Sequence, residues 1–284
     1  MGGSLMRSYF CGWYFRCQTG QQTLAIIPSV HKTKKSNFCA IQLITDTESF
    51  QVEFPFSAFQ KHDDQITIAE NRFGKEGIHL DIQTPSLRAN GSMRFGSFSP
   101  IRYDIMGPFR FVPFMQCRHS VYSMHHSVDG EITVNGTQHQ FQNAIGYVEG
   151  DRGYSFPKEY VWTQCSFPNG ALMLSIADIP LETLRFTGVI GIVYLNGKEY
   201  RLATYLGSKA IKITPDEIVV RQGEYFLTVK PKDISGHPLQ APVAGAMSRT
   251  IYGHPSCNVN YRFEKKGIPL MEIDAHNAAF EYEY

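Results

Sequence analysis

Five dipeptides of the hairpin-turn type punctuate the chain, and they constrain its fold more than any other feature of the sequence. Asn or Asp followed by Gly tolerates the positive φ angles of the tight turns that join antiparallel strands. We therefore expect β-hairpins and antiparallel pairing around these positions. The five dipeptides are Asn90-Gly91, Asp129-Gly130, Asn135-Gly136, Asn169-Gly170 and Asn196-Gly197.

Short segments with strand-like patterns lie between these turns. Ile78, Leu80 and Ile82 alternate with polar residues, as do Ile132 and Val134, which is typical of strands with one buried face. Few segments show a long helical period. Many short strands separated by Gly and Pro predict an all-β fold, either a sandwich or a barrel. Further β-rich segments are residues 23–27, 38–44, 50–54, 160–167, 171–176, 199–205, 217–220 and 225–229.

The length allows one large domain or two modest ones, because 284 residues with 43% hydrophobic content can bury a substantial core. Residues 95–114 look irregular, since Pro100, Gly107, Pro108 and Pro113 interrupt any regular element. We place a boundary near residue 110. This divides the chain into an N-terminal part, residues 1–110, and a C-terminal part, residues 111–284.

Composition and charge exclude several classes of protein. The formal net charge of +1 offers no global attraction to nucleic acid or an anionic membrane, and the three lysines within residues 31–35 are interpreted as a solvated hairpin tip. No stretch approaches the roughly 20 apolar residues of a transmembrane helix. Six cysteines without paired spacing are expected to be reduced thiols. We therefore predict a soluble, cytoplasmic protein without a transmembrane segment.

Motifs for nucleotide binding, zinc proteolysis and serine hydrolysis are missing from the sequence. His119, His125, His126 and Cys117 offer ligand atoms for a metal ion. Adjacent strand residues point to opposite faces, however, so His125 and His126 do not enter one site together. We predict no metal site and interpret these histidines as polar strand residues.

Residues 146–165 form the densest unusual segment of the chain. Its middle contains glycines and a proline, so we predict a turning loop that brings Glu149 or Asp151 to the mouth of a cavity. If the strand that follows alternates, Tyr160, Trp162 and Gln164 share one face. Such a wall suits an amphipathic, ring-bearing ligand.

A structural interpretation of the same segment stays open beside the functional one. Glu149 and Asp151 can pair with Arg152 and Lys158 simply to hold the loop in place, while Trp162 fills a hydrophobic core. On spacing alone, both interpretations account for the residues.

Three separated stretches resemble the tocopherol cyclase family, in the same order and over nearly the full chain. The opening stretch matches Gly-Trp-Tyr-Phe, the middle one matches Gly-Tyr-x-Glu-x-x-x-Gly-x-x-Phe-Pro followed by Trp-x-Gln, and a closing stretch follows. The residues concerned are Gly12 to Arg16; Gly146, Tyr147, Glu149, Gly153, Phe156, Pro157, Trp162 and Gln164; and Leu239 to Pro242, Gly245, Met247 and Arg249 to Ile251.

The resemblance implies a lipocalin-like, calycin-type pair of antiparallel β-barrel halves, similar in architecture to carotenoid 1,2-hydratases. The sequence departs from the family pattern at three positions. Cys11 and Gly253 stand where the family has Glu, and Arg152 stands where an aromatic residue precedes the glycine. The fold therefore transfers from the resemblance, whereas the substrate does not.

Family members close a chromanol ring on a prenylated quinol, a reaction that needs an acid, an aromatic wall and a base but no redox cofactor or metal. A buried carboxyl group with a raised pKa suits the acid. We expect Glu149 to donate the proton, with Asp151 as the second candidate. The expected substrate contacts are Trp162, Tyr160, Gln164 and His119, and the expected barrel wall is Trp13 and Tyr14.

Three functions remain compatible with the sequence. The first is acid-catalysed cyclisation or isomerisation of a prenylated or polycyclic lipophile in a β-barrel cavity. The second is a non-catalytic carrier of a hydrophobic small molecule, and the third is a structural protein with a degenerate pocket. The missing family carboxylates favour a carrier, and the retained Glu149 favours chemistry.

Overall fold

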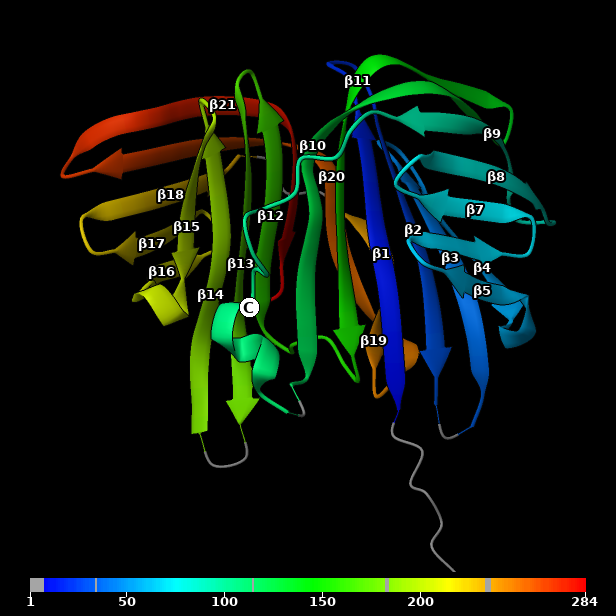
Figure 1. The fold of residues 1–284 in the computed structure, drawn as a ribbon, viewed down its shortest axis with the longest axis horizontal. Coiled ribbons are helices and arrows are strands. Elements are labelled where there is room, and N and C mark those ends of the chain that lie inside the picture. The colour runs from blue at the N-terminus through cyan, green and yellow to red at the C-terminus, as the bar shows by residue number, and fades with distance from the viewer. Residues whose placement is uncertain (1–7, 34, 114, 182–183, 233–235) are drawn as a thin grey trace, which may run out of the picture. The chain divides into compact units, whose positions relative to one another are not determined.

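The structure, a computed structural model, consists almost entirely of antiparallel β-strands (Figure 1). It describes residues 8–33, 35–113, 115–181, 184–232 and 236–284. Within these ranges there is no α-helix. The three short helical segments, Phe56–Ala58, Gly107–Phe111 and Thr204–Leu206, are all 3-10 turns. The all-β class predicted from the sequence is therefore confirmed.

The first of two large sheets contains eleven strands in the described part of the chain. Its order is β4-β3-β2-β1-β11-β10-β9-β8-β7-β6-β5. Strand β1, near the N-terminus, therefore pairs with β2 on one side and with β11, distant in sequence, on the other (Figure 1). The strands are β1 (Tyr9–Gln18), β2 (Thr23–Lys32), β3 (Asn37–Thr45), β4 (Ser49–Pro55), β5 (Phe59–His62), β6 (Gln65–Ile68), β7 (Asn71–Gly74), β8 (Gly77–Gln83), β9 (Arg88–Phe95), β10 (Cys117–Val134) and β11 (Thr137–Gly153).

A hydrophobic core fills one side of this sheet. Trp13, Phe15 and Cys17, alternate residues of β1, pack there with Val148 of β11 and with residues of every strand from β2 to β10 except the short edge strand β5. From β4, Val52 joins the core, and Phe59 of β5 packs against it. Aromatic contacts such as Trp13 with Phe59 show that β1 and the edge strand β5 face each other across this core. The sheet thus curls around its own interior, as in a lipocalin-like barrel.

The second sheet has the order β15-β14-β13-β12-β21-β20-β18-β17-β16, with β19 paired to β20. Its own core is built from aliphatic and aromatic residues on one face of these strands, including Val161, Cys165 and Phe280. The strands are β12 (Tyr160–Phe167), β13 (Gly170–Leu181), β14 (Leu184–Leu195), β15 (Lys198–Ala203), β16 (Lys209–Thr214), β17 (Glu217–Gln222), β18 (Tyr225–Pro231), β19 (His237–Val243), β20 (Ala246–Lys265) and β21 (Ile268–Tyr282).

Two compact units result, and neither is a continuous stretch of chain. The first comprises Met1–Pro100, Cys117–Phe156 and Leu239–Thr250, and the second comprises Ile101–Gln116, Pro157–Pro238 and Ile251–Tyr284. The boundary expected near residue 110 falls inside a segment of the second unit. A single cut does not separate the units, because β10 and β11 follow that position yet pair with β9 and β1 of the first unit.

The five expected turns divide into two groups. Asn135-Gly136 connects β10 to β11 and Asn196-Gly197 connects β14 to β15, as predicted, and Asn169 lies in the turn between β12 and β13. The prediction was wrong for Asn90-Gly91 and Asp129-Gly130, which lie inside β9 and β10. At Gly91 and Gly130 a Cβ atom would stand 2.2 Å from a carbonyl oxygen of the paired strand, so glycine serves close strand approach there.

Two further observations bear on the sequence-based expectations. All six cysteines are free thiols. In the described ranges, no helix has the length and apolar character needed to cross a bilayer.

Candidate functional site

The candidate site lies on the face of the first sheet that points away from its hydrophobic core. Side chains of β11 alternate, so Val148 belongs to the core while Tyr147, Glu149 and Asp151 project from the other face. Glu149 is only 5% exposed although it is a carboxylate. The local sequence therefore buries both faces of this strand and places two acidic groups on the polar one.

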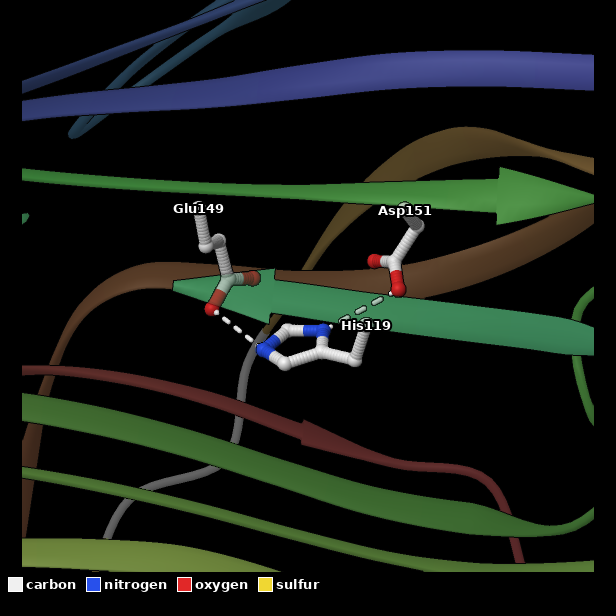
Figure 2. Close-up of side chains that lie close together, drawn as sticks. All are labelled: His119, Glu149 and Asp151. Carbon is white, nitrogen blue, oxygen red and sulfur yellow. Dashed lines mark hydrogen bonds and ion pairs between the residues drawn. The ribbon is translucent and has the colours of Figure 1, made fainter. Parts of the chain in front are cut away.

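His119 of β10 lies between the two carboxylates (Figure 2). Its Nδ1 is 3.0 Å from Oδ1 of Asp151, and its Nε2 is 3.2 Å from Oε2 of Glu149. The β10–β11 register places His119 directly opposite Asp151, and residues opposed in antiparallel strands share a face. The result is a Glu149–His119–Asp151 cluster in which Glu149 and His119 are buried, His119 being 8% exposed, and Asp151 is partly exposed.

Two opposing effects act on the proton of His119. Burial disfavours the imidazolium and lowers its pKa, but the nearby Glu149 and Asp151 attract positive charge, and the balance holds the pKa of His119 well above its usual value. Nε2 of the protonated ring and Oε2 of Glu149, 3.2 Å apart, form an ion pair. The cluster thus carries a proton that is held mainly by charge.

Two further groups extend the cluster at its ends. The hydroxyl of Tyr147 donates a hydrogen bond of 2.5 Å to Oε2 of Glu149, and the thiol of Cys117 lies 3.4 Å from Oδ1 of Asp151. Burial, reinforced by the adjacent carboxylates, raises the pKa of both Tyr147 and Cys117 well above their usual values. Both groups are therefore neutral donors to the carboxylates.

This arrangement can move protons. A histidine between two carboxylates can release a proton from Nε2 towards Glu149 and recover it, while Asp151 fixes the ring through Nδ1. His119, Glu149 and Asp151 also each offer an atom that can ligate a metal ion, all within 4.8 Å of one another. An ion on Nε2 would take the place of its proton, so the two uses exclude each other.

Trp13 and Tyr14, which were expected to form one wall, lie on different faces of β1. Trp13 is 6% exposed and belongs to the hydrophobic core of the first unit. Tyr14, the next residue of β1, is opposite Glu149 in the β1–β11 register and so shares the polar face with the cluster. Only Tyr14 of this pair lies beside the predicted acid.

The other predicted contacts, Tyr160, Trp162 and Gln164, lie on β12 in the second unit. They alternate with core residues such as Val161 and Cys165, so they do share the opposite face, as predicted. All three are buried. Polar atoms there are bound within the unit, since Tyr160 donates to Glu281 at 2.6 Å and Gln164 donates to Ser166 at 3.0 Å.

Tyr147 and Cys117 were not singled out from the sequence as site residues. A signal existed for Tyr147, which lies two residues before Glu149 and therefore on the same face of a strand. The preceding Gly146 also has a local reason, because a Cβ there would lie 2.1 Å from Nε2 of the buried His126. Cys117 was named from the sequence only as a group that could ligate a metal ion, and its contact with Asp151, 34 residues away, depends on the pairing of β10 with β11.

Solved structures share the fold at low sequence identity. A putative AttH protein from Nitrosomonas europaea has a TM-score of 0.54 at 11% identity, covering 100% of this chain and 94% of that one. CghA with Sch210972 has a TM-score of 0.61 at 8% identity, covering 98% and 88%. Kievitone hydratase from Nectria haematococca has a TM-score of 0.52 at 10% identity, covering 97% and 89%. These likenesses concern the fold.

Comparison of the sequence with the curated proteins gave no match. The sequence does match a family model. The model described as tocopherol cyclase-like matches residues 85–279, which is more than half of the chain and includes His119, Glu149 and Asp151. The chain therefore belongs to the tocopherol cyclase-like family.

Proposed function

We propose that this protein catalyses a proton-transfer reaction, either cyclisation or isomerisation, on a lipophilic small molecule. The observation that carries the proposal is the Glu149–His119–Asp151 cluster, in which Glu149 and His119 are buried and Asp151 is partly exposed. Burying an ionisable pair is costly and is typical of sites that do chemistry. Family membership supports a prenylated or polycyclic substrate.

The proposed reaction begins with delivery of one proton from the Glu149–His119 pair to an alkene carbon of the substrate. Glu149 is the transferring group, and His119 supplies it with the proton from Nε2. The resulting carbocation is captured by an oxygen of the same molecule, which forms the new C–O bond. The proton released from that oxygen returns to the pair, so the protein is regenerated and the product has the mass of the substrate.

Each neighbour has a proposed role in this sequence. Asp151 holds the imidazole through Nδ1, and Tyr147 holds Oε2 of Glu149. Tyr14, on the same face, is the aromatic residue beside the acid. In the second unit, Tyr160, Trp162 and Gln164 remain predicted ligand contacts. A cytoplasmic location of the protein also remains a prediction.

A carrier function is the alternative, and one experiment separates the two. The purified protein is incubated with a hydrophobic extract of its host, and mass spectrometry identifies what it retains and what it converts. The proposal predicts an isomer of equal mass and altered retention time, with conversion lost in Glu149→Gln and preserved in the matched exposed control Glu131→Gln. Dialysis against EDTA should leave conversion unchanged.

Other outcomes would redirect the assignment. A gain of one water would replace cyclisation by hydration at the same acid. A retained but unchanged ligand, bound equally by Glu149→Gln, would establish a carrier and refute the proposal. Failure to retain any molecule would favour the structural interpretation.

A further inference from the structure

A second cluster of chemistry-bearing side chains lies on the opposite face of β1 from the Glu149–His119–Asp151 cluster. Tyr9, Cys11 and Trp13 are alternate residues of β1 and share the core-side face. The register places Lys32 of β2 opposite Tyr9 and Arg152 of β11 opposite Cys11. A cation therefore flanks β1 on each side at this end of the strand.

A third cation reaches the same place from β5. The Nζ atom of Lys61 lies 5.3 Å from the centre of the Trp13 ring, and Phe59 of the same strand stacks on Trp13 at 6.3 Å. Lys61 and Arg152 both act on the thiol of Cys11, which places them around one half-buried residue. We call Lys32, Lys61 and Arg152 the cationic rim.

The cationic rim has no counter-ion among the described residues, since no carboxylate of those residues forms an ion pair with Lys32, Lys61 or Arg152. Asp151 is a carboxylate that also acts on the Cys11 thiol, but it is paired with His119. Burial raises the pKa of Tyr9 to about 12 and also raises the pKa of Cys11, so both are neutral at physiological pH. Three positive charges thus gather locally in a chain whose formal net charge is +1.

The floor between these cations is apolar and aromatic. Trp13 is nearly buried, Cys11 is half-buried, and Tyr9 and Tyr122 expose 38% and 43% of their surface beside them. Tyr122 lies against Gly150, where a Cβ would come within 3.1 Å of its ring. Cations at a rim and aromatic groups beneath it are complementary to a molecule with an anionic head and an apolar body.

We propose that this end of the first unit binds an amphipathic organic anion, with its oxyanion head between Lys61 and Arg152 and its apolar part against Trp13 and Tyr122. A flat anionic membrane fits less well, because Cys11 is only half-exposed and Trp13 is 6% exposed, so that a flat surface makes little contact with either. Cys11 and Arg152 are direct partners in the register. This site lies on the opposite face of β1 from the proposed acid–base cluster and can be tested separately from it.

The test uses dodecanoate as the probe and Cys11 as the reporter. The full-length protein is alkylated with iodoacetamide, and the modification of each cysteine is followed by mass spectrometry with and without dodecanoate. Cys117, the other half-buried cysteine, serves as an internal reference. We expect dodecanoate to slow modification of Cys11 in a saturable manner that weakens with added salt, and to leave Cys117 unaffected.

A charge-matched pair of variants sharpens the result. Lys61→Gln/Arg152→Gln should raise the dissociation constant of dodecanoate about tenfold or more, because both head-group contacts are removed. Lys75→Gln/Lys209→Gln, which changes exposed lysines elsewhere by the same total charge, should leave it unchanged. Circular dichroism checks that both proteins are folded, and Arg152→Lys should retain part of the affinity.

Three further probes, dodecanol, inorganic phosphate and phosphatidylglycerol vesicles, test which features of the ligand are recognised. Each of them has an outcome that contradicts the proposal. Equal protection by neutral dodecanol would show that charge is irrelevant, and equal protection by inorganic phosphate would show that no apolar part is recognised. Protection by phosphatidylglycerol vesicles but not by dodecanoate would make this end a membrane-binding surface instead. Unchanged binding in Lys61→Gln/Arg152→Gln would overturn the proposal outright.

Discussion

Strand β12 and residues 146–150 of β11 are buried on both faces, yet the polar groups that they bury differ in kind. β12 buries neutral side chains, such as Thr163 and Gln164, whose polar atoms are satisfied within the second unit. β11 buries Glu149 beside His119, and Nε2 of that histidine forms an ion pair with Oε2 of Glu149 at 3.2 Å. Burying neutral side chains whose polar atoms are hydrogen-bonded costs a fold little free energy. Burying charged groups costs more and is typical of catalytic sites.

The largest expected difference between the two strands is catalytic. Glu149→Gln keeps the shape of the side chain but removes its ability to transfer a proton, so turnover of the substrate should fall by roughly 10²–10⁴-fold. Single-turnover kinetics on the substrate found in the extract measures this loss. A carboxylate introduced on β12 by Gln164→Glu should not replace the one lost from Glu149. Glu131→Gln is the control. Turnover at the wild-type rate in Glu149→Gln would mean that Glu149 on β11 is not catalytic, so that β11 and β12 would not differ in this respect.

The second prediction concerns the stability of the cluster. His119→Leu leaves Glu149 and Asp151 without their cation, and breaking such a buried pair should lower the free energy of unfolding by about 3–5 kcal/mol at neutral pH. Urea denaturation measures the change. The triple variant His119→Leu/Glu149→Leu/Asp151→Leu has no buried charge left and should recover most of the stability. If His119→Leu alone has wild-type stability, the ion pairs of the cluster do not exist in solution.

Raising the pH should remove part of the stabilisation that protonated His119 provides. The folded protein raises the pKa of His119 well above its usual value, so folding binds a proton that the unfolded chain holds less tightly. The stability that this proton provides is fully present below about pH 6.5, the unfolded value, and is lost as pH rises through the folded pKa. The difference in unfolding free energy between wild type and His119→Gln should therefore shrink with rising pH. A difference that grows with pH would mean that His119 is buried as the neutral form.

The smallest effect is expected in β12. Thr163 Oγ1 donates to the carbonyl of Ala279 at 2.8 Å and lies 2.6 Å from the hydroxyl of Tyr261. Thr163→Val removes two hydrogen bonds of the buried Oγ1, to Ala279 and Tyr261, and should cost about 1–3 kcal/mol of stability. Turnover should stay at the wild-type level. Thr163→Val/Tyr261→Phe should cost less than the sum of the single changes, and a catalytic loss in Thr163→Val would make β12 a second reactive strand.

The strand content could be predicted from the sequence because it depends on local patterns. The segment 160–167 was predicted as a strand and corresponds to β12. Glycines were harder to interpret, since both a turn and a close strand contact favour glycine. Asn135-Gly136 serves a turn, while Gly91 and Gly130 allow backbone approach inside strands, and the dipeptide alone does not distinguish the two uses.

The candidate site could be predicted in part for the same reason. Glu149 and Asp151 are two residues apart and share a face whatever their partners are. Their pairing with His119 depends on the β10–β11 register. A regular hairpin closed at Asn135-Gly136 would place Ser120 opposite Asp151 and turn His119 to the other face. Register shifts along β10 move the pairing by one residue, and one residue exchanges the faces of a strand.

The return of Leu239–Thr250 to the first unit has a consequence for protein synthesis. This segment is fastened late, through hydrogen bonds between Gln42 and the backbone of Gln240 at 3.1 and 3.0 Å and between Tyr154 and Gly245 at 2.8 Å. A ribosome that adds roughly 5–20 residues per second needs about 4–16 s to translate the intervening Pro157–Pro238. During that interval the nascent chain exposes the faces that Gln240 and Gly245 later cover, and a chaperone that recognises them would act in this window of translation.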